Sequence, residues 1–336
     1  MNAQRKPGWA LTLVPVALAL VAACAAVRPD APGPPWASTL EREHPLVGRI
    51  WDVGVGRFID ATALVDRLVS ERFILLGEKH DNPDHHRLQA WTLRALIAAG
   101  RRPAVGFEMF TLDEIPAIAR YLATLPADGA GLGEAVRWDQ SGWPPWPMYR
   151  PIADAAIGAG LPIVATNLPR QTVQAVGRHG LAALDQALVA ELHLDRPLSP
   201  GDHAALANEI TASHCNMIPA AMVEPMIAVQ RARDAQMAQR LAAAGARDGA
   251  VLIAGTGHVR QDRGVPAFLR LQVPGAAIAS VAFLEVQAGE TRPEGYAGQF
   301  GDGPFPVDFV WFTPRLEDTD PCEKFRAPLE RLRRGE

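Results

Sequence analysis

Short apolar runs that stop abruptly at polar or small residues recur along the chain, and each is followed by a helical pattern. Runs that are hydrophobic throughout, rather than alternating, are typical of strands buried on both faces of a sheet. Their alternation with helices predicts an α/β fold with a mainly parallel sheet flanked by helices on both faces. The four runs cover residues 73–77, 104–107, 161–165 and 251–254.

The second half of the chain predicts further elements. Residues 202–244 form one long helical stretch, and a further helix begins near Val265. Two strand-like segments follow at residues 277–286 and 307–312. The segment between them is rich in Gly and Pro and has no crossover helix, so we expect late antiparallel strands at one edge of the sheet.

The N-terminus has the pattern of a targeting segment. Arg5 and Lys6 precede an apolar run that ends in small residues just before Cys24. This pattern predicts a signal peptide over residues 1–23, with Cys24 in the sequence context of a bacterial lipoprotein. Lipidation of Cys24 would anchor the protein to a membrane on the periplasmic side. Ala25, rather than Asp, favours the outer over the inner membrane. The alternative is an ordinary secretory signal that contains a cysteine.

Composition supports a folded body behind this segment. Of the 336 residues, 48% are hydrophobic and 21% charged, which excludes a disordered or multispanning chain. Residues 24–43 include a proline-rich stretch that predicts an extended tether. We expect a single α/β domain over residues 44–325 and a C-terminal tail over residues 326–336.

Charge and cysteine content exclude several classes of function. The net charge of −4 provides no basic face for phosphates, so no nucleic-acid partner is expected. Only three cysteines occur, and no CxxC pair exists to attach haem covalently or to form a zinc ribbon. Cys215 and Cys322 remain once Cys24 is lipidated; an oxidising periplasm would let them form a disulfide, and two separate buried thiols are the alternative.

Polar side chains follow the ends of four predicted strands. Ligands of open α/β sheets bind outside the carboxyl ends of the strands, so we expect these side chains to meet there. Asn82 and Pro83 predict a helix N-terminus at the same edge, which favours an anionic group. The side chains in question are Glu78 and His80, Glu108, Asn167, and His258.

Two interpretations of these side chains stay open. Glu78, His80 and His258 could hold a divalent metal with an open coordination position. Alternatively, the two carboxylates of Glu78 and Glu108 are neutralised by salt bridges. The basic residues considered for such salt bridges are Lys79, Arg150, Arg170 and Arg260.

An aromatic segment at residues 138–150 contains three of the eight tryptophans. Such a segment can form the flat wall that a planar ligand needs, or it can cover the open edge of the sheet. Four methionines, Met217, Met222, Met226 and Met237, recur at near-helical spacing, and core packing is the favoured interpretation for them.

Taken together, these motifs resemble the ChaN family of haem-binding lipoproteins. The resemblance spans residues 48–322. It lies in the segment 76–82 with His85, His86 and Gln89, in residues 106–109, 143–149, 167–170 and 214–215, and in residues 254–260 with Asp262 and residues 264–266. It implies a fold of the wider Tiki and erythromycin-esterase superfamily and a role in haem or iron uptake. Relatives in that superfamily use positions matching Glu78, His80, Glu108 and His258 for hydrolysis, sometimes with a metal.

Haem binding needs an apolar slot, an axial ligand and partners for two propionates. We expect noncovalent haem with Tyr149 as axial ligand, since a phenolate suits ferric iron; His80, His85 and His86 are the alternatives. Lys79 and Arg170 would pair with the propionates. A slot shared between two subunits would make the protein a homodimer. The competing hypothesis is a metal-dependent hydrolase in which Glu78 or Glu108 is the general base and His80 and His258 bind metal or an anionic intermediate.

Overall fold

A computed structural model describes residues 1, 33, 35–124, 126–324 and 326. The expected signal peptide beyond Met1, the lipidation site Cys24 and residues 327–336 of the C-terminal tail lie outside the described residues. Within the described part, none of the helices is both long and apolar enough to span a bilayer.

The centre of the molecule is one eight-stranded sheet with the order β2-β1-β8-β7-β3-β6-β4-β5. The strands are β1 (Ile50–Asp52), β2 (Arg57–Ile59), β3 (Phe73–Glu78), β4 (Ala104–Thr111), β5 (Ile163–Asn167), β6 (Ala250–Gly255), β7 (Ile278–Glu285) and β8 (Phe309–Thr313). All pairs from β8 to β5 are parallel, which confirms the predicted fold class.

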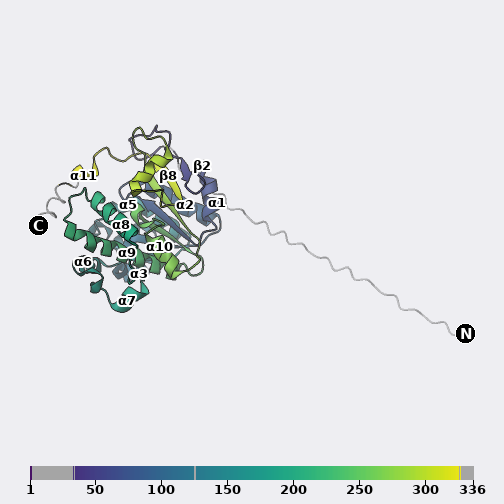
Figure 1. The fold of residues 1–336 in the computed structure, drawn as a ribbon. Coiled ribbons are helices and arrows are strands. Elements are labelled where there is room, and N and C mark those ends of the chain that lie inside the picture. The colour runs from purple at the N-terminus through teal and green to yellow at the C-terminus, as the bar shows by residue number, and fades with distance from the viewer. Residues whose placement is uncertain (2–32, 34, 125, 325, 327–336) are drawn as a thin grey trace.

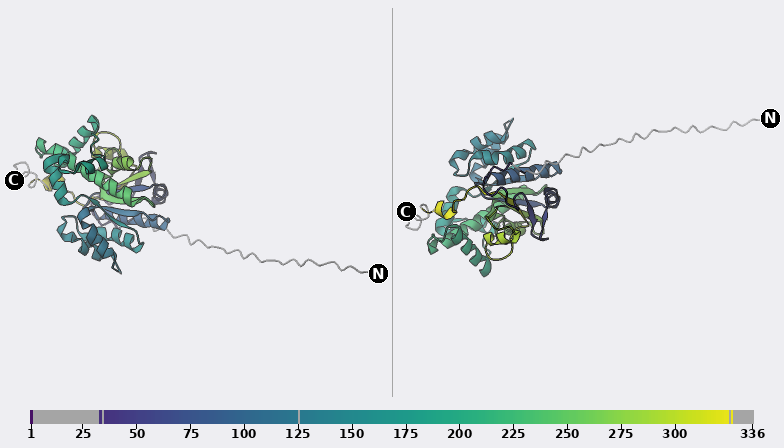
Figure 2. Two further views of the ribbon diagram at one scale, coloured as in Figure 1. Left: turned by 90° about the horizontal axis from the view of Figure 1, so that it is seen from below. Right: turned by 90° about the horizontal axis from the view of Figure 1, so that it is seen from above.

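Helices cover both faces of this sheet, as Figures 1 and 2 show. One layer is α1 (Ala61–Leu68), α2 (Pro83–Ala98), α3 (Ile115–Leu122), α4 (Gly129–Ala135) and α5 (Trp146–Gly158). The other contains α6 (Arg170–His179), α7 (Gln186–Glu191), α8 (Pro200–Ser213), α9 (Val223–Ala244) and α10 (Val265–Gln272). The short helix α11 (Pro321–Lys324) follows the last strand. The 3-10 helices are η1 (Leu112–Glu114), η2 (Trp138–Gln140), η3 (Gly180–Ala183), η4 (Ala220–Met222), η5 (Thr256–His258) and η6 (Pro293–Phe300).

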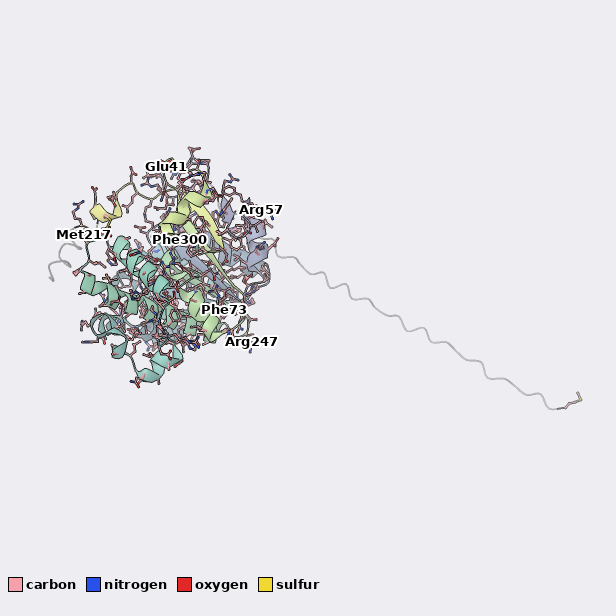
Figure 3. All side chains as sticks on the ribbon, in the orientation of Figure 1. Glu41, Arg57, Phe73, Met217, Arg247 and Phe300 are labelled. Atoms are coloured by element: carbon pink, nitrogen blue, oxygen red, sulfur yellow. A yellow bond between two sulfur atoms is a disulfide. The ribbon has the colours of Figure 1, made fainter. Side chains whose placement is uncertain are left out.

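The two-sided burial explains why the central strands are apolar at every position. Along β3, Ile74 and Leu76 join the core beneath α1, α2 and α5, whereas Phe73 and Leu75 join the core beneath α9 and α10. Successive side chains of a strand point to opposite faces, so a strand covered on both sides needs apolar residues throughout. Side chains fill the space between the sheet and both layers (Figure 3).

The antiparallel edge is made by the first and last strands. β1 pairs antiparallel with both β2 and β8, so the late strand β8 lies in an antiparallel pair as expected. β7 and β8, however, run parallel to each other, and the expectation that these two would pair antiparallel was wrong. The chain between them crosses over through the 3-10 helix η6, which takes the place of an α-helical crossover.

Two other expectations need correction. The helical stretch 202–244 is broken between α8 and α9, where Cys215 and Asn216 adopt positive φ angles that an α-helix cannot contain. The expected tether also packs onto the domain from Trp36 onward. Trp36 is buried, and the backbone N–H of Ser38 donates to Asp84 Oδ2 over 2.8 Å.

Candidate functional site

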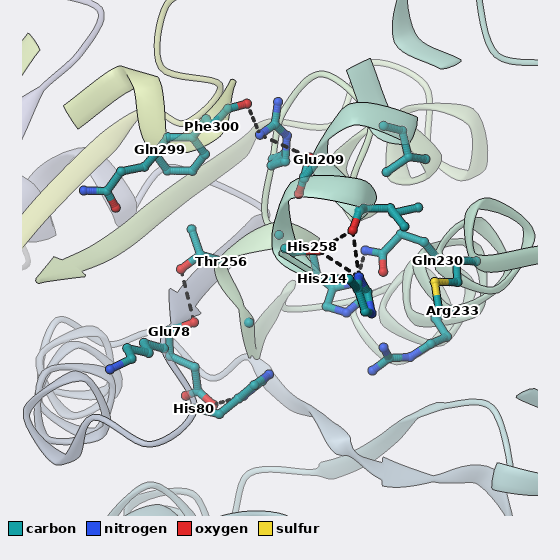
Figure 4. Close-up of a pocket in the computed structure, with 18 of the residues that line it drawn as sticks. Glu78, His80, Glu209, His214, Gln230, Arg233, Thr256, His258, Gln299 and Phe300 are labelled. Carbon is teal, nitrogen blue, oxygen red and sulfur yellow. Dashed lines mark hydrogen bonds and ion pairs between the residues drawn. The ribbon is translucent and has the colours of Figure 1, made fainter. Parts of the chain in front are cut away.

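The polar strand ends meet at one edge of the sheet. Glu78 ends β3, Glu108 lies in β4, and His80 bridges them: its Nδ1 is 2.9 Å from Glu78 Oε1 and its Nε2 is 4.0 Å from Glu108 Oε1. Asn167, at the end of β5, donates through Nδ2 to the Glu108 carbonyl oxygen over 2.9 Å. The parallel topology therefore brings together side chains that are up to 180 residues apart, such as Glu78 and His258 (Figure 4).

Glu78 is buried beside three side chains, Tyr149, His80 and His86. The Tyr149 hydroxyl donates to Oε1 over 2.8 Å, and His86 Nδ1 lies 3.1 Å from Oε2. Burial by itself would raise the pKa of Glu78, but His86 and His80 outweigh it and lower the pKa to about 2. Glu78 is consequently a carboxylate throughout the neutral range.

Glu108 is held by a second set of partners. Arg233 Nη2 lies 2.5 Å and His258 Nε2 3.3 Å from Oε1, while the Gly255 backbone N–H donates to Oε2 over 2.7 Å. Burial opposes ionisation here too, but His258 and Arg233 hold the pKa of Glu108 well below its usual range. Glycine at position 255 leaves room for the His80 ring, because a Cβ there would lie 2.9 Å from His80 Nε2.

His258 connects Glu108 to a third carboxylate. Its Nδ1 lies 2.5 Å from Asp234 Oδ1, and both residues are buried. Burial disfavours the imidazolium, but Glu108 and Asp234 raise the pKa of His258 to about 9. His258 is thus a cation at neutral pH and lies between two carboxylates.

His85 and His86 are neighbours in the first turn of α2, and their pKa values are shifted in opposite directions. His85 Nδ1 accepts from the Lys79 backbone N–H over 2.9 Å, and Nε2 bonds the Thr313 hydroxyl over 2.9 Å. Burial holds the pKa of His85 well below its usual range, so this ring is neutral. His86 Nε2 instead donates to the His80 carbonyl oxygen, and Glu78, outweighing burial, raises the pKa of His86.

A cavity of about 860 Å³ opens above this charged cluster. Its floor is the sheet edge, with Glu78, His80 and His258. Its opposite wall is formed by α8, η4, α9 and η6, which contribute these apolar side chains: Leu206, Ile210, Met222, Met226, Val229 and Phe300. A cavity with one charged and one apolar side suits an amphiphilic ligand with anionic groups at one end.

Family membership is decided by a match over most of the folded domain. The family model for haem-binding uptake proteins of the Tiki superfamily, ChaN, matches residues 64–269, which include the whole charged cluster. The chain belongs to the ChaN family. No curated protein sequence matches it significantly.

One solved structure has the same fold, and two others are more distant. A structure described as cofacial haem binding to ChaN of Campylobacter jejuni is 19% identical, with a TM-score of 0.61, and covers 78% of this chain and 95% of that one. The type III effector HopBA1 is 15% identical over 75% of this chain and 91% of that one, with a TM-score of 0.43. Erythromycin esterase EreC is 14% identical over 80% and 83%, with a TM-score of 0.37. The latter two are too distant to bear on the function of this chain.

Several predicted haem contacts of this ChaN family member lie outside the cavity. Tyr149 is fully buried, and burial together with Glu78 raises the pKa of its phenol. A protonated phenol that donates to a carboxylate presents no phenolate to iron in this conformation. His86 is also buried beneath the floor, and Arg170 is an exposed residue that does not line the cavity. Lys79 does line it and pairs with Glu285 at 3.2 Å.

The aromatic segment is divided between two roles. Trp138 and Trp146 are buried in the core against Phe110, whereas Trp143 meets the His80 ring edge-on with centroids 4.9 Å apart. None of the tryptophans in the described residues lines the cavity, and its apolar wall comes from α8, α9 and η6 instead.

The metal hypothesis finds no support. Across the part of the chain that the structure describes, no group of three or more His, Cys, Asp or Glu side chains could hold a metal ion. The polar atoms of Glu78, His80 and His258 already have partners within the protein. His80 pairs with Glu78, and His258 pairs with Asp234 and Glu108. Both carboxylates do lie beside basic side chains, but not those considered from the sequence. Glu108 pairs with Arg233, whereas Glu78 faces His80 and His86.

The contribution of α9 was not expected from the sequence. Arg233 and Asp234 sit in the middle of a helix, where charged residues usually face solvent, and no strand end marks them. Met222 and Met226, assigned to the core, line the cavity, whereas Met237 is fully buried as expected. The structure also contains a disulfide between Cys215 and Cys322, which is one of the two arrangements that the sequence left open.

Proposed function

We propose that this protein binds haem noncovalently in the cavity between the sheet edge and helices α8 and α9, and that it serves haem or iron uptake as a lipid-anchored protein of the bacterial envelope. The observation that carries the proposal is the two-sided cavity of about 860 Å³ in a chain of the ChaN family. Its volume falls within the range of about 300–1,000 Å³ typical of ligand sites.

The residues present fit a haem. The apolar side chains of α8, α9 and η6 supply a wall for the macrocycle, and cations at the floor supply partners for propionates. Lys79 is 36% exposed at its side chain, and Arg233 is 20% exposed. The two described cysteines are bonded to each other, so neither offers a thiol to a haem vinyl group.

A homodimer is part of the proposal. The Campylobacter jejuni ChaN structure is described as binding haem cofacially, that is, with two haem planes facing each other. One haem per cavity in each of two copies would produce this arrangement. We expect haem to increase the fraction of dimer in size-exclusion chromatography with light scattering, and a monomer at full haem occupancy would refute it.

Haem titration tests the central claim. Adding ferric haem to the protein should produce a saturable Soret shift at an integral stoichiometry. Ser213 lines the cavity and is exposed, so Ser213→Trp should fill part of it without disturbing the core, and weaken haem binding at least about tenfold. The matched control is Ala212→Trp, an exposed neighbour that does not line the cavity. Unsaturable or absent binding by the wild type would overturn the proposal.

The envelope location has its own test. Cys24 follows a predicted signal peptide, and lipidation there would hold the protein in the membrane fraction. Cys24→Ser should move it to the soluble fraction, and an unchanged membrane fraction would refute lipid anchoring.

A hydrolase is the second candidate, because carboxylates and imidazoles converge at the cavity floor. The charge states argue against it. With a pKa of about 2, Glu78 is a weak base, and with a pKa of about 9, His258 has no free lone pair at neutral pH. General bases work best with pKa values near the working pH. Ester hydrolysis abolished by Glu108→Gln, in a wild type that binds no haem, would favour the enzyme.

A further inference from the structure

The proposed function does not say which residue is the axial ligand to the haem iron. An assignment of this ligand rests on the proposed haem binding. His214 follows the last residue of α8 and lines the cavity. Its Nδ1 lies 2.7 Å from the Ile210 carbonyl oxygen. A carbonyl oxygen only accepts, so Nδ1 carries the proton and Nε2 carries the lone pair. Histidines that bind metals usually have this arrangement, in which the second ring nitrogen donates to an oxygen.

The other histidines of the cavity use their rings elsewhere. Both nitrogens of His258 face carboxylates, and both nitrogens of His85 are hydrogen-bonded. His80 is tied to Glu78 through Nδ1, and its Nε2 points toward the Glu108 carboxylate at 4.0 Å. His214 differs from these three because no described group is bonded to its Nε2.

The chain has only three tyrosines, and the hydroxyl of each already has a hydrogen-bond partner. The Tyr149 hydroxyl donates to Glu78, and that of Tyr121 bonds Asp128. The Tyr296 hydroxyl donates to the Glu290 carbonyl oxygen, and Tyr296 itself is buried. None of them lines the cavity.

The face of α8 that carries His214 is also built for an apolar ring. Leu206, Ile210 and His214 follow one another at intervals of four residues, so their side chains lie along one face of the helix. All three line the cavity, and Met222 and Met226 face it from η4 and α9. An imidazole at the end of an apolar strip matches the needs of a macrocycle with a central iron.

The position of His214 is secured from the other side by covalent structure. The next residue, Cys215, is bonded to Cys322, which ties the end of α8 to the helix α11. The ring is thus attached to a backbone held at two points, by the α8 hydrogen bonds and by the disulfide.

We propose that Nε2 of His214 is the axial ligand to the haem iron in this protein. The ligand would come from the helix wall of the cavity, opposite the charged strand ends where the sequence placed the candidate ligands.

The test compares haem spectra of His214→Ala with those of His203→Ala. His203 lies on the same helix, pairs with Glu224 on the surface and does not line the cavity. We expect His214→Ala to bind ferric haem at least about tenfold more weakly, with a changed Soret band and electron paramagnetic resonance spectrum. Added imidazole should restore the wild-type spectrum, because it occupies the vacated coordination position. His203→Ala should match the wild type in both respects.

A second variant distinguishes loss of the iron ligand from loss of the fold. His214→Tyr keeps an iron ligand at the position but replaces the imidazole with a phenol, so the spectrum should change while binding persists. If the wild type binds haem and the spectra of both His214 variants equal the wild-type spectrum, the ligand assignment is wrong and the proposed function stands. If the wild type binds no haem, the proposed function itself fails.

Discussion

The charged cluster makes the stability of this protein depend on pH through His258. Its imidazolium lies between Glu108 and Asp234, at 3.3 Å and 2.5 Å. Raising the pH removes the proton and leaves two buried carboxylates that face a neutral ring. Because the pKa of His258 is higher in the folded protein than in the unfolded chain, its stabilising contribution is fully present below pH 6.5 and disappears as the pH rises through about 9.

The magnitude follows from the pKa values. A rise from 6.5 to about 9 corresponds to about 3 kcal/mol of folding free energy, since each pKa unit is worth about 1.4 kcal/mol. For a urea dependence of about 3 kcal/mol per M, the unfolding midpoint should fall by about 1 M between about pH 6 and pH 10.

Urea unfolding of wild type and His258→Gln across this range is the assay. Other groups titrate as well, including His80 and His86, whose pKa values are also raised. The informative quantity is therefore the difference: the wild type should lose about 3 kcal/mol more than His258→Gln. His179→Gln, an exposed site, serves as the control and should follow the wild type. Equal losses in wild type and His258→Gln, or an imidazole of His258 that titrates near 6.5 by NMR, would show that the imidazolium does not stabilise the fold.

Two further predictions concern the scaffold that holds the site. Gly77→Ala should lower the free energy of unfolding by about 1–3 kcal/mol in urea titration, because the added Cβ would lie 2.5 Å from Val259 Cγ2. Gly158→Ala, with open space at its Cβ, should cost nothing, and an equal loss in both variants would contradict the packing argument. Replacing Cys215 and Cys322 with Ser should lower the thermal midpoint and cost about 4 kcal/mol, since their disulfide closes a loop across 107 residues. An unchanged midpoint would contradict this estimate.

The charged floor of the cavity was predictable from the sequence because its residues obey a topological rule. Glu78 is the last residue of β3, Glu108 follows the last residue of β4 that pairs with β6, Phe107, and His258 lies just beyond β6. Parallel strands present these positions at one edge of the sheet. Their partners on α9 follow no comparable rule. The residues around Arg233 and Asp234 in the sequence resemble those of a solvent-exposed helix face. These two side chains reach the site only because α9 packs against the strand ends.

The expectation for Tyr149 illustrates the same limit. Its place in an aromatic segment near the strand edge was correctly inferred, but which way the side chain points depends on α5. That helix directs the phenol down to Glu78 and not up into the cavity. His214 was noticed only as part of a motif, since nothing local shows that a helix end four residues after Ile210 would border a cavity.

The class of fold, the parallel sheet and the edge at which polar side chains collect could all be predicted from the sequence, because hydrophobic periodicity and strand-end geometry are local properties of the chain. The charge states of the site residues and their access to the cavity follow only from the folded arrangement. The pKa of a carboxylate such as Glu78 and the free nitrogen of His214 depend on atoms brought close by folding from distant parts of the chain. Local pattern therefore located the site, and long-range packing determined which of its residues can meet a ligand.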